Sequence, residues 1–460
     1  MIKKLTINIV AGLLLLVPSL LFSQTGFTEY GLKGIPQSSN LNPAFKPNAS
    51  LVFGLPVISS VNAGIYNTAF SFNDIFVQHP GDDSLYFNLT RPINSKSSSN
   101  YLSESFSVEL LSVGFRAGNG FMTVGIRNRV NARFYYTPDL LRFLWNGNGG
   151  YIGEQLFLSG TALYEEHFND YYAGISFPVG YNVDVGIRAH FLQGLSNIST
   201  GRSNLTLLTE PDNVTGYRLT AQTDFSVETS GINDLLSDST DFSPVDYFMN
   251  FGNIGYSFDV GIDARMGEQF VLQASVTDLG QLFWYGNPKN YSSSEAEVTF
   301  NGIDYDFSAE NESNAFETYM DSLGNLLEVK EDARVYQSFL RTSMFLNGQY
   351  ITLDEKHVFN LLFAGRFLEQ SFEFALSAGY TFMPSDKFAF KLSYNYLKYA
   401  PLNLGLGFYF NFKPFQLYFT TDNVAGLFYI YGQHYADFHF GLNILIPYQY
   451  KNDIPWEHAP

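Results

Sequence analysis

The sequence predicts an all-β fold: a transmembrane antiparallel β-barrel of roughly 14 strands (range about 12–18), with an N-terminal hatch-like segment and short helical insertions. Three observations support this prediction. Apolar and polar residues alternate over long stretches, and these stretches are long enough to cross a bilayer. The composition also combines few charged residues (15%) with many aromatic ones (17%). Soluble domains average about 25% charged residues, whereas a mean hydropathy of -0.05 is too polar for a bundle of membrane helices.

The first residues have the form of an export signal. Lys3 and Lys4 precede an apolar run that ends near Phe22, and the small Ser23 stands before Gln24. This order is typical of a signal peptide with its cleavage site. The alternative is an N-terminal membrane anchor, for which the run is barely long enough. We expect residues 1–23 to be removed between Ser23 and Gln24, and the mature chain to reside in the cell outer membrane. The chain has no Cys, which excludes disulfides and a lipid-anchored lipoprotein.

The C-terminal third carries the clearest strand pattern. Apolar residues occupy every second position over 372–382, 388–396 and 404–412. A helix would instead repeat every three or four residues. Each stretch reaches the length of about nine to eleven residues that a tilted membrane-crossing strand needs, while strands of soluble domains usually have about five or six.

Similar alternation upstream places charged residues on the polar face of the strands. A β-sandwich that is secreted would also turn such a face to water, but strand length and the aromatic strand ends at 133–138 and 408–419 favour the barrel. The charges can either pair across a closed interior or line a polar permeation path, and we expect the plugged interior. The candidate lumen charges are Arg127, Arg129, Asp184, Arg188, Asp259, Asp263, Arg265 and Lys391.

The chain divides into few parts. We expect a hatch or plug segment at 24–50, one barrel domain at 51–447 and a C-terminal tail at 448–460. Short turns join the C-terminal hairpins, as at 383–387 and 398–403. Longer insertions at 138–158, 230–250 and 310–332 carry helix-like sequence.

Three motifs resemble those of a known family. GLKGIPQSSNLNPAFKP (31–47), GIRAHFLQGLSNIST (186–200) and GYSFDVGIDA…LQASVTDLGQLFW (255–284) are similar to an uncharacterised outer-membrane barrel family, a domain of unknown function. The family occurs in Gram-negative bacteria with type IX secretion and gliding machinery, and the resemblance covers most of the mature chain. It is more distantly similar to the fatty-acid-transporter (FadL-like) barrels, which carry an Asn-Pro near the mature N-terminus and fold their N-terminal segment into the lumen as a hatch.

The N-terminal motif contains a predicted turn, Asn42, Pro43, Ala44 and Phe45. Pro43 fixes its own φ and keeps Asn42 out of the helical region. The resemblance implies that the polar stretch before this turn lies in the lumen, with the first strand beginning near Leu51. The alternative is a cap that only pins the first strand.

The sequence shows no pattern that predicts catalysis or a bound cofactor. We find no nucleophile elbow, phosphate loop or calcium loop. His434 and His439 with Asp437 are candidate metal ligands, but they straddle both faces of a strand, so hydrogen bonding in the lumen is favoured. A net charge of -18 argues against nucleic acid as a partner. We therefore expect no enzyme activity, no cofactor and no metal site.

Two functions lead, and a third, an outer-membrane hydrolase, would need a Ser-His-acid cluster that the sequence spacing does not show. The first is a plugged or gated passive transporter of small solutes, hydrophobic ones among them, which the FadL-like resemblance implies. The second is a non-transporting scaffold or accessory subunit of a secretion or gliding apparatus. The expected partners are outer-membrane lipid, a small hydrophobic solute under the first reading, and secretion or gliding components under the second.

Overall fold

The computed structural model describes residues 26–78, 85–93, 100–213, 216–232, 243–293, 296–300 and 329–447. No helix in these ranges has both the length and the apolar character needed to cross a membrane. The predicted signal peptide, its cleavage site at Ser23 and Gln24, and the tail at 448–460 lie outside the described residues.

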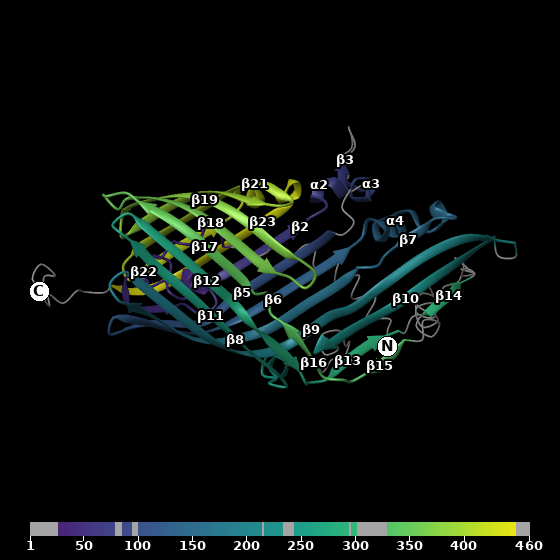
Figure 1. Ribbon diagram of the computed structural model, residues 1–460, viewed down its shortest axis with the longest axis horizontal. Coiled ribbons are helices and arrows are strands. Elements are labelled where there is room, and N and C mark those ends of the chain that lie inside the picture. The colour runs from purple at the N-terminus through teal and green to yellow at the C-terminus, as the bar shows by residue number, and fades with distance from the viewer. Residues whose placement is uncertain are drawn as a thin grey trace, which may run out of the picture.

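Fourteen antiparallel strands form a closed barrel, as the sequence predicts. Neighbouring strands follow each other in chain order, and the last strand pairs with the first, which closes the ring (Figure 1). The barrel strands are β1 (Ala49–Gly54) with β2 (Val61–Asn67), β5 (Asn100–Ala117), β6 (Gly120–Tyr136), β8 (Ala162–Val179), β9 (Val183–Asp212), β11 (Asn253–Met266), β12 (Phe270–Trp284), β17 (Ser343–Ile351), β18 (His357–Phe367), β19 (Phe372–Ser385), β20 (Phe388–Leu397), β21 (Ala400–Phe412), β22 (Phe415–Thr421) and β23 (Tyr435–Pro447).

The first strand is interrupted. Both β1 and β2 lie between β5 and β23, and residues 55–60 separate them. Val57 in this break has φ 70, a left-handed conformation that is rare for a β-branched residue. The break bulges the wall without opening it, because Val57 N and Glu109 N still bond across to Glu109 O and Ser60 O. The strand begins at Ala49, two residues before the predicted Leu51.

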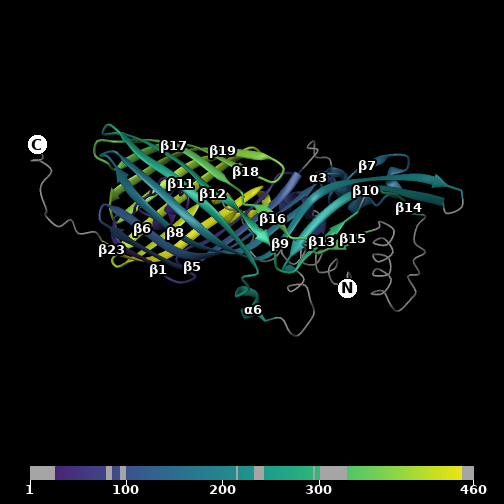
Figure 2. The ribbon, with the colours of Figure 1, turned by 60° about the horizontal axis from the view of Figure 1, so that its bottom comes forward.

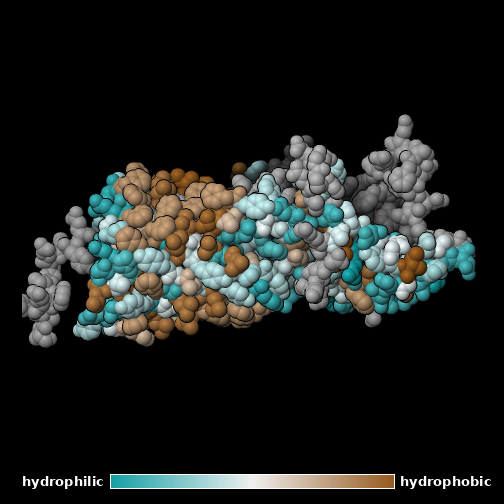
Figure 3. Space-filling model, turned by 90° about the horizontal axis from the view of Figure 1, so that it is seen from above, coloured by the Kyte–Doolittle hydropathy of each residue, from teal (hydrophilic) through white to brown (hydrophobic). Residues whose placement is uncertain are grey.

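The two faces of the wall have the polarity of a membrane barrel. In β20, Leu392 is 47% exposed on the outside, whereas the neighbouring Lys391 is 1% exposed on the inside. A soluble β-sandwich would bury its apolar face. The exposed apolar face and buried polar face seen here therefore exclude the secreted sandwich. Apolar residues gather over the barrel surface seen in Figure 3, and hydrophilic ones at its left rim and over the part beyond the barrel.

The two ends of the barrel differ. At one end, here called the short-turn end, tight turns such as 118–119 and 386–387 join the strands. At the other, the long-loop end, β9 and β10 (Gly216–Ser230) continue past the barrel and begin a sheet that projects beyond it, here called the outward sheet (Figures 1 and 2). The strands outside the barrel ring are β3 (Phe76–Gln78), β4 (Leu85–Phe87), β7 (Gln155–Phe157), β10 (Gly216–Ser230), β13 (Pro288–Ser292), β14 (Ala296–Phe300), β15 (Lys330–Asp332) and β16 (Tyr336–Phe339).

Within the residues that the structure describes, the helices are few and short. At the start of α4 (Pro138–Asn146) the side chain of Thr137 accepts a bond from Leu140 N, and Pro138 takes the first helical position, where its missing N–H costs nothing. This helix lies in the predicted insertion at 138–158, and α6 lies in the one at 230–250; most of the insertion at 310–332 lies outside the described residues. The helices are α2 (Phe72–Ile75), α3 (Thr90–Ile93), α4 (Pro138–Asn146), α6 (Pro244–Phe248) and α8 (Val424–Phe428), with 3-10 turns η1 (Pro36–Asn40), η2 (Gly149–Tyr151) and η3 (Ile430–Gly432).

Candidate functional site

Residues 26–48, called the N-terminal segment, lie inside the barrel before β1 begins. The segment contains one 3-10 turn, η1, and contributes no strand to the wall. It is held by side-chain contacts to strands on many sides of the ring. At its start, Asp422 at the end of β22 accepts bonds from Phe27 N (3.0 Å) and Thr28 N (2.6 Å). Near its end, Lys46 pairs with Asp184 of β9 at 2.5 Å.

The middle of the segment is anchored by buried charged groups. Glu29 Oε2 lies 2.5 Å from His439 Nδ1, an ion pair when the histidine is protonated. Lys391 Nζ donates to Tyr30 O at 2.7 Å. Arg188 donates to Asn40 Oδ1 at 2.6 Å and to Ser39 Oγ at 2.9 Å. These contacts give buried charges the partners that they need at low dielectric.

The Asn42–Pro43 turn rests on two glycines of the wall. Asn42 Nδ2 donates to Ile262 O (3.2 Å) and Ala274 O (3.3 Å), and its Oδ1 accepts from Ala44 N (3.0 Å). A Cβ at Gly186 would lie 2.0 Å from the Pro43 carbonyl carbon, and one at Gly261 would lie 2.0 Å from Asn42 Oδ1. The turn can approach the wall this closely only because both positions lack a side chain.

An apolar cluster completes the contact between segment and wall. Tyr30 stacks on Phe345 of β17 with ring centroids 5.0 Å apart, and it packs edge-on against Phe45 at 5.3 Å. Burial of this kind stabilises by about 25 cal/mol per Å² of apolar surface.

A chain of ion pairs links the inner faces of neighbouring strands, from β6 to β12. Asp170 of β8 accepts from Arg127 at 2.7 Å and from His190 Nδ1 at 2.7 Å, and the Nε2 of the same histidine lies 3.0 Å from Asp259. Arg129 binds Asp278 through two bonds of 2.7 and 2.8 Å.

Asp278 has φ 59 at a bulge of β12, and its N–H donates to Asp259 Oδ1 at 2.8 Å. The left-handed backbone here is rare outside glycine and commonly marks a functional or constrained position.

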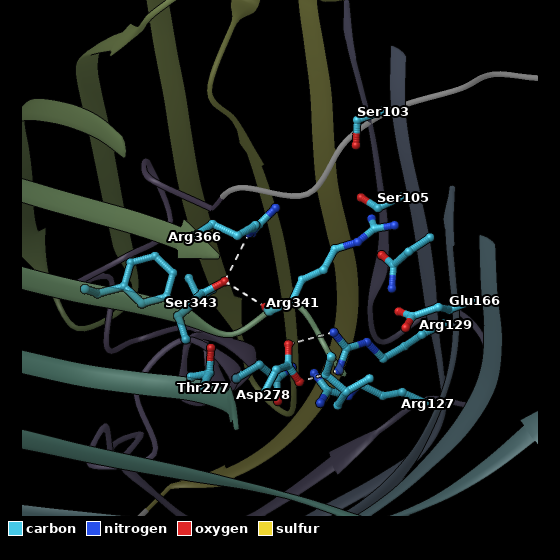
Figure 4. A pocket seen from close by; sticks show the side chains of 15 residues that line it. Ser103, Ser105, Arg127, Arg129, Glu166, Thr277, Asp278, Arg341, Ser343 and Arg366 are labelled. Atoms are coloured by element: carbon cyan, nitrogen blue, oxygen red, sulfur yellow. Dashed lines mark hydrogen bonds and ion pairs between the residues drawn. The ribbon is translucent and has the colours of Figure 1, made fainter. Parts of the chain in front are cut away.

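A cavity of about 50 Å³ lies between the N-terminal segment and the long-loop end of the barrel. Asn40 and Leu41 of the segment form part of its lining. Twelve of its fifteen lining residues are polar or charged, and the remaining three are Leu41, Leu340 and Phe345. We call it the arginine cavity, and its charged lining residues are Arg127, Arg129, Glu166, Asp278, Arg341 and Arg366 (Figure 4).

Glu369, in the turn between β18 and β19, holds two arginines at the edge of this cavity. Its carboxylate accepts from Arg133 at 2.8 Å and from Arg341 at 2.9 Å. Burial by itself would raise the pKa of Glu369, but the two guanidinium groups favour the charged carboxylate and lower the pKa to about 2. The carboxylate is therefore charged at neutral pH.

The eight predicted lumen charges have different surroundings. Seven lie on the inner face or against the N-terminal segment; these are Arg127, Arg129, Asp184, Arg188, Asp259, Asp263 and Lys391. Asp263 pairs with Lys33 of the segment. Arg265 is different, because it lies at the short-turn rim with a 47% exposed side chain that pairs with Glu355 at 3.4 Å.

The sequence predicted two of the four arginines that line the cavity, Arg127 and Arg129, but not the cavity itself or the other two, Arg341 and Arg366. Arg341 precedes β17, outside any alternating stretch, and Glu369 lies in a turn. Arg366 belongs to β18, whose alternation includes the polar Asn360 and could have indicated an inward side chain.

The two histidines that are candidate metal ligands, His434 and His439, form hydrogen bonds instead. His439 Nε2 contacts Ser60 Oγ (2.8 Å) and Tyr418 OH (2.9 Å), and His434 Nδ1 contacts Asn67 O (3.0 Å). Among the described residues, no group of three or more His, Asp or Glu side chains has the arrangement of a metal site.

Comparisons with solved structures return outer-membrane barrels at very low identity. A Pseudomonas aeruginosa FadL homologue is 10% identical with a TM-score of 0.43, covering 93% of this chain and 99% of its own. The Ralstonia pickettii toluene transporter TbuX is 8% identical (TM-score 0.41; coverage 90% and 94%). The Pseudomonas putida toluene transporter TodX is 9% identical (TM-score 0.39; coverage 92% and 98%).

No curated protein matches the sequence. A family model does match, over residues 43–422, which is most of the chain. The chain therefore belongs to the family of unknown function DUF5723.

Proposed function

We propose that the protein is a passive, non-enzymatic transporter of small solutes in the outer membrane, and that the N-terminal segment is its plug. Short turns face the periplasm in bacterial outer-membrane barrels and longer loops face outward. With that orientation, the segment fills the periplasmic half of the lumen, and a solute from outside would meet the arginine cavity before the plug.

The main support for this proposal is the way in which the N-terminal segment is attached to the barrel wall. It lies in the lumen without joining the sheet, and separate side-chain contacts such as Asp422–Thr28 and Asn42–Ile262 attach it to the wall. Contacts of this kind contribute about 0.5–1.5 kcal/mol each, or about 1.5–3 kcal/mol when one group is charged. The segment can therefore leave its seat without breaking the barrel, whose strands are joined by continuous ladders.

The lining of the cavity favours a polar solute. Its walls are formed mainly by guanidinium, carboxylate, amide and hydroxyl groups, and its floor by Asn40 and Leu41. A hydrophobic solute, which the FadL-like resemblance implies, would leave these groups unpaired. Mass spectrometry of solvent extracts from the purified protein tests for a retained hydrophobic molecule independently.

Solute flux through proteoliposomes tests the transport proposal. Asn42→Ala removes the polar contacts of the turn with the wall, so efflux of arabinose and phosphate should rise at least about tenfold over wild type. The matched control is Asn290→Ala, which deletes an equally buried amide that bonds to Asp332 and Arg334 in the outward sheet. No flux above protein-free liposomes from folded wild type and folded Asn42→Ala would overturn the proposal.

A second function, a scaffold for surface machinery, has one structural feature in its favour. Strands β9 and β10 pair over residues 197–212 and 216–230, and with β7, β13, β14 and β15 they form a sheet that projects beyond the barrel. Transport does not require such an extension. A stoichiometric partner that co-purifies from native outer membranes, and is lost when the tip of the β9–β10 hairpin is shortened, would support the scaffold.

A further inference from the structure

A strip of polar side chains lies on the outer face of the barrel. Asn169 of β8 and Gln193 of β9 are only 5% and 0% exposed. The alternation of each strand places them on the same face as Tyr171 and Phe191, which point away from the lumen. Asn169 Nδ2 donates to Gln193 Oε1 at 3.1 Å. Because lipid offers no hydrogen bonds, buried amides on the outside of a membrane barrel need cover from the protein itself.

The cover is residues 243–251, here called the α6 loop, which contain α6 and lie against the outside of the wall. Gln193 Nε2 donates to Phe248 O at 2.9 Å. Tyr247 OH lies 2.9 Å from Nδ1 of His167, another outward residue of β8. In Figure 2 α6 lies below the barrel, on the outer side of the wall. The inner side of the α6 loop therefore gives the polar strip its hydrogen-bond partners.

The opposite side of the α6 loop is apolar. Four large side chains there are 43–70% exposed, and they are called the α6 patch: Val245, Phe248, Met249 and Phe251. Single exposed apolar residues are common on protein surfaces, but several gathered in one place mark a contact with a protein or a membrane.

The α6 patch is continuous with the lipid-facing wall. Phe251 stacks on Phe191, with ring centroids 6.5 Å apart and planes at 19°. Tyr171 lies against both rings, at 6.0 and 6.3 Å. Tyr256, the register partner of Phe191, is 46% exposed and packs against Phe258, the next outward residue of β11. The patch and the wall therefore form one apolar surface.

The length of β11 indicates how deep the α6 patch lies in the membrane. A tilted strand crosses the hydrocarbon core in about nine to eleven residues. Counted from Met266 at the short-turn end, that length ends near Tyr256, close to Phe251 of the patch. Membrane barrels gather aromatic residues at this boundary between hydrocarbon and water.

We propose that the α6 patch is a membrane anchor, which rests at the boundary between headgroups and acyl chains in the leaflet nearer the long-loop end. An amphipathic element at a membrane interface buries its apolar side at this depth. Lipid is the occupant because lipid already covers the adjoining wall, whereas a protein partner would have to displace lipid there to reach the patch. The inference does not depend on whether the barrel transports a solute.

The stability of the barrel is not a suitable measure of this contact. The penalty for an arginine on the lipid face falls toward zero near the membrane interface. A charge in the α6 loop should therefore leave the unfolding midpoint nearly unchanged, and the depth of the loop has to be measured directly.

Spin-label accessibility tests the proposal on the full chain in phosphatidylcholine liposomes. Because the chain has no Cys, Met249→Cys carries a single label. Oxygen concentrates among acyl chains and a nickel chelate in water, so the ratio of their collision rates with the label reports its surroundings. We expect this ratio at Met249→Cys to be several-fold higher than at Phe157→Cys and to approach the ratio at Val260→Cys.

Phe157→Cys is the matched control, since it also replaces a large exposed apolar residue but lies in β7 of the outward sheet. Val260→Cys, on the lipid-facing side of β11, gives the ratio for a label among acyl chains. Phe251→Cys is a second position in the α6 patch, so that poor folding of one variant leaves the other decisive. The proposal is overturned if the ratios at Met249 and Phe251 both equal the ratio at Phe157. The loop would then face water in a lipid-only membrane, and its apolar side would fit a protein partner instead.

Discussion

Gly186 of β9 and Gly261 of β11 are direct register partners, and the Asn42–Pro43 turn rests on both. Seventy-five positions separate the two glycines in the chain, yet they form one recess in the wall. The recess explains why a turn predicted from the sequence has a fixed place in the lumen.

Gly186→Ala should displace the Asn42–Pro43 turn from the barrel wall. The new Cβ would lie 2.0 Å from the Pro43 carbonyl carbon, and overpacking of this kind costs about 1–3 kcal/mol. Hydrogen exchange at the amides of Ala44 and Phe45 should become about 10-fold to 100-fold faster. Gly348→Ala is the control, because nothing lies within 4 Å of its Cβ. Equal protection of these amides in both variants would contradict the prediction that the turn requires glycine at position 186.

Asp422→Ala should free the start of the segment. It removes the acceptor of Phe27 N and Thr28 N, and bonds to a charged acceptor are worth about 1.5–3 kcal/mol each. Because the chain has no Cys, Thr28→Cys provides a single reactive thiol. Its labelling by a water-soluble thiol reagent should accelerate at least about tenfold in the Asp422→Ala background, but not in Asp224→Ala, which acts on the outward sheet. The same labelling rate in both backgrounds would contradict this anchor.

Leu392→Arg should destabilise the barrel. Leu392 points outward near the middle of β20, and an arginine on the lipid face at mid-membrane costs about 2–4 kcal/mol. The unfolding midpoint in urea, measured in lipid vesicles, should fall accordingly. Val245→Arg places the same charge on an exposed residue of α6, outside the barrel, and should leave the midpoint unchanged. If the two variants behave alike, the membrane-facing surface is wrongly assigned.

The ion pairs of Glu369 with Arg133 and Arg341 predict a specific dependence of the protein's stability on pH. Its folded pKa of about 2 lies below the ordinary value of about 4.3, so its contribution is complete above pH 4.3 and is lost as the pH falls through 2. At pH 7 Glu369→Gln should cost about 3 kcal/mol, and this difference from wild type should shrink at pH 3. Glu355→Gln, which alters an exposed ion pair with Arg265, should show no such change. A Glu369→Gln deficit that is equal at pH 7 and pH 3 would contradict the pairing.

The alternation of the sequence was sufficient to predict which strand residues face inward. Lys391 and Arg188 could be assigned to the lumen because a strand has a strict period of two. Arg265 shares that period but lies at the rim. Alternation indicates which side of the wall a residue faces, but not how far along the barrel axis it lies. The cavity could not be predicted because Arg341 lies in the short break between β16 and β17 and Glu369 lies in a turn, and their contacts with each other and with Arg133 form only when the barrel closes. The outward sheet was missed because β9 continues without a break from the wall into the sheet.

The most direct test of the plug is to lock it. Thr28 Oγ1 and Ser393 Oγ of β20 lie 2.8 Å apart, so a Thr28→Cys/Ser393→Cys pair places two sulfurs within reach of a disulfide. Thr223→Cys/Ser293→Cys is the control, since those hydroxyl oxygens are 3.3 Å apart in the outward sheet. Phosphate flux through proteoliposomes should stop when the first pair is oxidised and return on reduction, while the control pair has no effect in either state. Equal flux through the oxidised and reduced forms of the first pair would show that solutes cross without movement of the segment, and would contradict the plug.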